Sequence, residues 1–124
     1  MHNNVIFMLD NDKPFMELYT RILQNKGFQV FATDNLFILM KYAQTALPQW
    51  IFIDENYTQG RPEEIIKIIN KGFEFDYPKY TLMNNHHKYI HTSPSDGIDR
   101  IYKPHMLEKV IQLSESCCNQ YQIN

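Results

Sequence analysis

The stretch WIFIDENYTQG, residues 50–60, decides the fold class because a short apolar run stops abruptly on an acidic residue. Trp50 to Ile53 have the character of a buried strand, and polar residues that favour a turn follow Asp54 at once. A single Asp at a strand end is usually structural, because its side chain accepts hydrogen bonds from the turn. A functional role for Asp54 therefore requires polar residues at the ends of other strands.

Apolar runs alternate with amphipathic segments along the chain. Strands are predicted at residues 5–10, 28–32, 50–54, 80–83 and 99–103. Helices follow the first, second, third and fifth strands, and at most two helical turns are predicted in residues 84–97 after the fourth. Asp34 is the predicted N-cap of the second helix, and Leu107, Val110, Ile111 and Ser114 are predicted to face the core from the last one. Apolar strands that alternate with helices predict one α/β domain over residues 1–124, a doubly wound five-stranded parallel sheet with helices on both faces.

Composition narrows the function classes. The 124 residues include 12 Lys plus Arg and 14 Asp plus Glu, so a net charge of -2 gives no basic field for nucleic acid. No apolar run reaches membrane-spanning length and no signal peptide is evident, so we expect a cytoplasmic protein without membrane contact. Cys117 and Cys118 are adjacent, which favours reduced thiols and neither a disulfide framework nor a metal site.

Polar side chains follow the predicted strands at the edge where sites form in such sheets. They are Asp10, Asn11 and Asp12 after the first strand, Asp54 after the third, Asn84 and Asn85 after the fourth, and Lys103 after the fifth. Neighbouring carboxylates repel one another unless a cation lies between them, and oxygen ligands suit Mg²⁺. A lysine opposite them is suited to a phosphoryl group.

The chain resembles the receiver domain of two-component response regulators over nearly its whole length. The resemblance rests on the run Asp10, Asn11, Asp12, on Asp54 with Asn56 two residues later, and on Lys103 followed by Pro104. It implies a flavodoxin-like, receiver-like fold and a role in phosphorelay signal transduction. It also implies that the protein is no enzyme beyond self-catalysed phosphorylation and dephosphorylation.

The resemblance assigns a role to each matching residue. Asp54 is expected to be the phosphoacceptor, taking a phosphoryl group from a histidine kinase, a phosphotransfer protein or a small phosphodonor. Mg²⁺ is expected at Asp10, Asn11 and Asp54, with the backbone carbonyl of Asn56. Lys103 is expected to contact phosphoryl oxygens.

Further expectations concern the residues around this set. Asn84 stands where the family has a hydroxyl residue that bonds the phosphoryl group. The bond between Lys103 and Pro104 is expected to be cis and to turn the lysine inward. His86, His87 and His91 are close in sequence, but a polar loop more often carries solvated histidines than a metal site.

Three residues depart from the family pattern. Asn11 replaces an acid, so Mg²⁺ is expected to bind more weakly. Asn84 replaces a hydroxyl residue and Arg100 replaces the aromatic residue whose ring swings inward on activation, and a guanidinium does not readily enter an apolar slot. We therefore expect a homodimer or a downstream protein partner on the face of Arg100, Tyr102 and the helix from Met106 to be nearly insensitive to phosphorylation.

Two alternatives stay open. The substitutions also suit a phospho-independent pseudo-receiver that acts as a protein interaction module. The motif LDND matches the opening of haloacid-dehalogenase-type phosphatases, in which Asp10 would be the nucleophile and Asp12 the general acid. The chain is short for that family and lacks a cap insertion.

Overall fold

The computed structural model describes residues 4–73, 78–85 and 98–112. The strands are β1 (Val5–Leu9), β2 (Gln29–Thr33), β3 (Trp50–Asp54), β4 (Lys79–Asn84) and β5 (Asp99–Tyr102). The helices are α1 (Lys13–Asn25), α2 (Leu36–Ala43), α3 (Pro62–Asn70) and a further helical segment over 106–112. Short 3-10 helices, η1 (Glu55–Thr58) and η3 (Lys103–His105), follow β3 and β5. No helix among these residues has the length and apolar character that a membrane crossing requires.

All five strands are parallel and lie in the order β2-β1-β3-β4-β5. The chain runs from β1 outward to β2 and then returns to the other side of β1 to form β3, so the winding direction reverses between β1 and β3. This is the flavodoxin-like, doubly wound α/β fold that the alternating pattern predicts. Ligand sites in such folds lie beside the carboxyl ends of the strands at this reversal, which here are Leu9 and Asp54.

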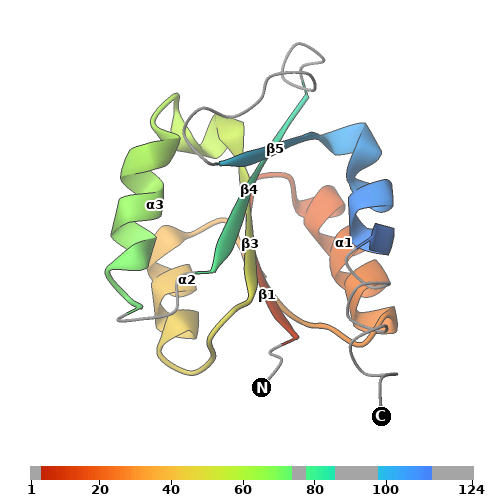
Figure 1. Cartoon of the computed structure of the whole chain (residues 1–124), viewed down its shortest axis with the longest axis horizontal. Coiled ribbons are helices and arrows are strands. Elements are labelled where there is room, and N and C mark those ends of the chain that lie inside the picture. Colours follow the sequence, from red (N-terminus) through yellow and green to blue (C-terminus); the bar gives the residue numbers. More distant parts are fainter. Residues whose placement is uncertain (1–3, 74–77, 86–97, 113–124) are drawn as a thin grey trace.

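Helices cover both faces of the sheet, as Figure 1 shows, with α1 and segment 106–112 on one side and α2 and α3 on the other. Side chains alternate along each strand, so Ile6 and Met8 pack toward α1 while Phe7 and Leu9 pack toward α2 and α3. Every residue of β1 is buried. Two apolar layers therefore fix the central strands whose ends carry the acidic residues.

Two details of the predicted helices were wrong. The N-cap of α2 is Asn35, whose side-chain oxygen accepts from the N–H groups of Phe37 and Ile38 at 2.9 and 3.2 Å. Asp34 lies one residue too early to reach those donors, because an N-cap side chain bonds the second or third helical residue.

The inner face of segment 106–112 also differs from the prediction. Met106 and Val110 are fully buried, whereas Leu107 and Ile111 are 46% and 38% exposed. The predicted buried face was wrong by about one residue, because Met106 was taken as the start of the helix and not as a core residue. Buried positions in a helix recur every three to four residues, so Met106 and Val110 lie on the same face. Ser114 lies outside the described residues.

Trp50 lies at the amino end of β3, four residues from Asp54. Its indole N–H donates to the Thr81 hydroxyl at 2.7 Å, and that hydroxyl donates to Asp99 at 3.0 Å. Lys109 pairs with the same carboxylate at 2.7 Å. This network joins β3, β4, β5 and segment 106–112 at the end of the sheet opposite Asp54, so Trp50 has a structural role there.

Candidate functional site

Four polar side chains converge at the carboxyl edge of the sheet. Asp10 follows β1, Asp54 ends β3, Asn84 ends β4 and Lys103 follows β5. All four are buried, with exposures of 0%, 4%, 2% and 7% in that order. Charged residues are rarely buried to this extent without a partner, so their shared location indicates a site and not an accident of packing.

The Lys103 ammonium lies between the two carboxylates. Its nitrogen is 2.8 Å from Asp10 Oδ2 and 3.5 Å from Asp54 Oδ1, and it stands over the Phe15 ring at 4.5 Å from the centroid. The peptide bond to Pro104 is trans, so the predicted cis isomer was wrong. The lysine points inward nevertheless, because Lys103 directly follows the extended Tyr102 and its long side chain reaches both acids from there.

Asp12 is already engaged in local structure. Its side-chain oxygen caps α1 by accepting from the N–H of Phe15 at 3.1 Å. Its own N–H donates to Asp10 Oδ1 at 2.9 Å. One oxygen of Asp10 is therefore fixed by the turn while the other faces Lys103.

The remaining donor atoms are oxygens of the kind that Mg²⁺ binds. Apart from Lys103, Asp10 Oδ2 and Asp54 Oδ1 have no hydrogen-bond partner within the described residues, which leaves acceptor capacity for a cation. Asn11 and Asn56 are both exposed beside them. No group of three or more His, Cys, Asp or Glu residues comes together in the described part of the chain. A metal ion at this site would therefore have at most two charged ligands, Asp10 and Asp54. His86, His87 and His91 lie outside the described residues.

The pKa of Asp54 is raised above the ordinary range of an aspartate. Burial is the largest cause, and the nearby Asp10 carboxylate adds to it. The Lys103 ammonium and a backbone hydrogen bond from Asn56 lower the pKa but do not offset those effects. Carboxyl groups whose pKa is shifted by burial and a neighbouring charge are found more often at functional sites than elsewhere.

Arg100 is held at the flank of the site. Its Nε is 3.9 Å from Glu55 Oε1, and the two side chains are only 16% and 20% exposed. Glu55 begins η1 directly after Asp54, so this pair links the loop of the acidic residue to β5. The pair was not predicted from the sequence, because its partners are 45 residues apart and no spacing rule connects them.

The loop after Asp54 is also tied to α2. The Leu36 N–H, near the start of α2, donates to the Tyr57 hydroxyl at 3.1 Å. Thr58 closes η1 by donating to the carbonyl of Glu55 at 2.6 Å. Gln59 and Gly60 then take positive φ values of 52° and 80° to turn the chain toward α3.

Several solved structures share the fold of this chain. No family model and no curated protein matches the chain. A CheY-like response regulator receiver domain from Methylobacillus flagellatus superposes with a TM-score of 0.70 at 15% identity, covering 91% of this chain and 99% of that one. The chain has the receiver fold.

Two further structures support this assignment. The Vibrio cholerae chemotaxis protein CheY4 gives a TM-score of 0.69 at 17% identity, covering 91% of this chain and 99% of that one. The N-terminal domain of NsrR, a lantibiotic response regulator, gives 0.66 at 14% identity, with coverages of 90% and 97%. At these identities the comparisons show a shared fold, and a shared fold alone assigns no chemistry to this chain.

Proposed function

We propose that the chain is a single, cytoplasmic receiver domain that accepts a phosphoryl group on Asp54 from a histidine kinase or phosphotransfer protein. Phosphorylation would regulate the binding of a partner protein, and the domain would otherwise act as a signalling module and not as a metabolic enzyme. The observation that carries this proposal is the buried Lys103 ammonium, which lies within 3.5 Å of both Asp54 and Asp10.

The proposed step is an in-line displacement. A carboxylate oxygen of Asp54 attacks the phosphorus of a phosphohistidine, the N–P bond breaks, and the released imidazole takes up a proton. The product is an acyl phosphate. Lys103 would move its ion pair from the carboxylate to a phosphoryl oxygen, as a point charge suited to phosphate. Asn84 would donate an amide N–H to the same group.

Mg²⁺ fits the oxygen donors of this edge. Asp10, Asn11, Asp54 and the backbone carbonyl of Asn56 would hold it, and when bound it would neutralise charge on the transferring phosphoryl group. Asp12 does not join this set, because its side chain caps α1. Weak Mg²⁺ binding is expected, since Asn11 contributes no charge.

A phospho-independent interaction module is the second candidate. Arg100 stands paired with Glu55 at the place of the moving aromatic ring, and Lys103 already neutralises one of the two buried carboxylates. Such a site is stable without a phosphoryl group. The phosphatase reading has less support, because Asp12, its general acid, is engaged as a helix cap.

The test is phosphorylation of the full chain by a small phosphodonor with and without Mg²⁺, followed by intact mass measurement. A Mg²⁺-dependent gain of one phosphoryl group that disappears in Asp54→Asn supports the first candidate. The matched control is Asp34→Asn, which removes an exposed carboxylate from the same sheet edge and should leave the gain intact. An unchanged mass under all conditions would favour the phospho-independent module.

A further inference from the structure

The strand at one end of the sheet has an open edge. Within the described residues β2 pairs with β1 alone. The Gln29 N–H donates to Asn4 and the Thr33 carbonyl accepts from Asp10, so both residues direct their backbone groups toward β1. Backbone groups alternate in direction along a strand.

The same alternation gives the direction of the remaining residues. Phe31 points its backbone groups toward β1, as Gln29 and Thr33 do, whereas those of Val30 and Ala32 point away from the sheet. An edge of this kind is a template for another strand unless charge, proline or a bulge protects it.

The two edges of the sheet differ in this protection. The β5 edge carries Asp99 and Arg100, and both form ion pairs with neighbouring side chains. The β2 edge reads QVFAT and has neither a charged residue nor a proline. Its backbone is therefore available for pairing in a way that the β5 edge is not.

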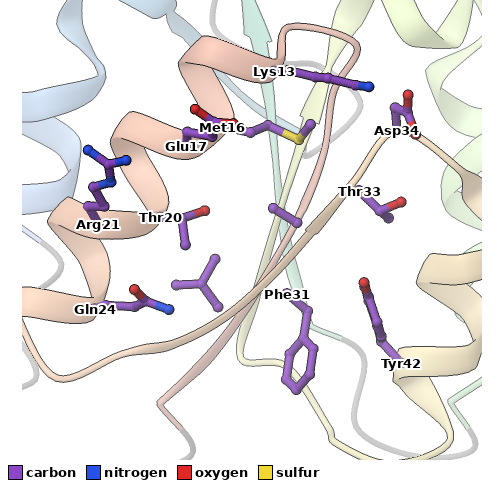
Figure 2. A pocket seen from close by; sticks show the side chains of 12 residues that line it. Lys13, Met16, Glu17, Thr20, Arg21, Gln24, Phe31, Thr33, Asp34 and Tyr42 are labelled. Carbon is purple, nitrogen blue, oxygen red and sulfur yellow. The ribbon is translucent and has the colours of Figure 1, made fainter.

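A groove runs along the open edge. It has a volume of about 630 Å³, and Figure 2 shows β2 crossing it between α1 and Tyr42 of α2. Phe31 projects toward the side of Tyr42. A second space of about 570 Å³ continues past Gln29 and Gly27, so the opening follows the whole strand.

We propose that the β2 edge is a self-association surface on which two copies of the chain pair their β2 strands antiparallel about a two-fold axis. Val30 of each copy pairs with Ala32 of the other through the outward backbone groups, which places Phe31 opposite Phe31 of the second copy. Closely spaced aromatic pairs of this kind stabilise antiparallel strands. A two-fold axis uses the same edge on both copies, which closes the assembly at a dimer.

The charges on the groove favour a second copy over a charged peptide. Lys13, Glu17, Arg21 and Asp34 line it and sum to zero. Glu17 and Arg21 lie one helical turn apart on α1, on either side of Thr20. Antiparallel pairing brings Glu17 of one copy toward Arg21 of the other, so the wall of the groove is complementary to itself.

The test measures oligomeric state and amide exchange together on the full, unphosphorylated chain. Sedimentation across micromolar to millimolar concentration should show a monomer–dimer equilibrium. Hydrogen exchange at the Val30 and Ala32 amides should slow as the dimer forms, whereas the amides of β5 should not respond. A monomer at every concentration, or a dimer in which those two amides still exchange freely, would overturn the proposal. So would protection of those amides by a foreign peptide with no self-association.

Variants separate association from folding. Ala32→Pro removes an outward N–H that β1 does not use, so circular dichroism should be unchanged while dimer affinity falls by about tenfold or more. Glu17→Arg should weaken the dimer and the double change Glu17→Arg/Arg21→Glu should restore it. Lys67→Glu, an exposed charge reversal on α3, is the matched control and should have no effect. Failure of the double change to restore affinity would contradict the two-fold arrangement.

Discussion

The groups around the Asp54 carboxylate shift its pKa in opposite directions. Burial and Asp10 raise the pKa, and Lys103 lowers it without offsetting them. A carboxyl group whose pKa is raised on folding binds its proton more tightly in the folded state. Stability therefore falls as pH rises from the ordinary aspartate range through the raised pKa, and the loss persists at neutral pH.

Asp54→Asn should accordingly stabilise the protein at neutral pH. The amide removes the buried charge and its repulsion with Asp10, and Lys103 keeps its 2.8 Å pair with Asp10. We expect a gain of about 1 kcal/mol in the free energy of unfolding near pH 7, shrinking toward zero near pH 4. Replacing a functional residue often stabilises a protein, because such residues are retained for activity and not for stability. Urea unfolding of both proteins across this range measures it. A destabilised variant at neutral pH would mean that the Lys103 pair outweighs burial.

Asn11→Asp should strengthen Mg²⁺ binding. One added charge a few ångströms from a solvated cation is worth about 1 kcal/mol or more, so we expect an increase in affinity of about tenfold. Amide chemical shifts of residues 10–12 and 54–56 during titration report it directly. Asp12→Asn is the comparison: it keeps a good N-cap for α1, and its effect on the affinity should be clearly smaller, because the Asp12 side chain is engaged at the cap. Equal affinities for Asn11→Asp and the parent would place residue 11 outside the metal site.

Among the elements, β5 carries Arg100 at the position where the resemblance to receiver domains implies an aromatic residue. Arg100 is paired with Glu55, while Ile101 packs against the core on the face of α1. A ligand shifts an equilibrium only by its differential affinity for the two states, so the proposed phosphorylation would gain little at β5, where no aromatic ring can be buried in place of Arg100.

Beryllofluoride, a phosphoryl mimic, should therefore change few amide chemical shifts along residues 98–112. Shifts are expected near Asp54, Glu55 and Asn84. The double variant Asn84→Thr/Arg100→Tyr supplies a hydroxyl and a ring, and should extend the shifts into this region. Large changes in the parent protein, together with dimer formation through this face, would reveal a switch that works through the Glu55–Arg100 pair.

The positions of the strands could be predicted from the sequence, whereas some details of the helices could not. The runs around Ile6, Ile51 and Leu82 are apolar on both faces, so strand positions and the parallel sheet followed from pattern alone. The cap of α2 could not be predicted in this way, because Asp34 and Asn35 are adjacent and either residue type caps a helix well. The buried face of segment 106–112 could not be predicted either, because the position of the first helical residue is uncertain by one or two residues.

The candidate site was predictable in part for a similar reason. Asp10, Asp54, Asn84 and Lys103 each lie at a strand end, and parallel strands bring such ends to one edge. Contacts that depend on side-chain reach were not predictable. Examples are the ring of Phe15 beneath Lys103 and the Glu55–Arg100 pair.

At the scale of the whole molecule, the fold separates three surfaces. Asp54 lies at the carboxyl ends of the strands, and the Trp50 network lies at their amino ends. The outer side of β2 is a third surface, along one side of the sheet. Chemistry at Asp54 can thus be altered without touching the proposed β2 contact. This separation lets each proposal fail independently of the other.

We predict that Asp54, and neither Asp10 nor Asp12, carries the phosphoryl group. Asp54 ends the central strand and faces Lys103, Asp10 is held by the turn at 2.9 Å, and Asp12 caps α1. The most direct measurement is chemical trapping of the acyl phosphate by reduction, followed by peptide mapping. The modification is predicted on Asp54 alone. Modification of Asp10 would contradict the proposed phosphoacceptor function of Asp54 and favour phosphatase chemistry.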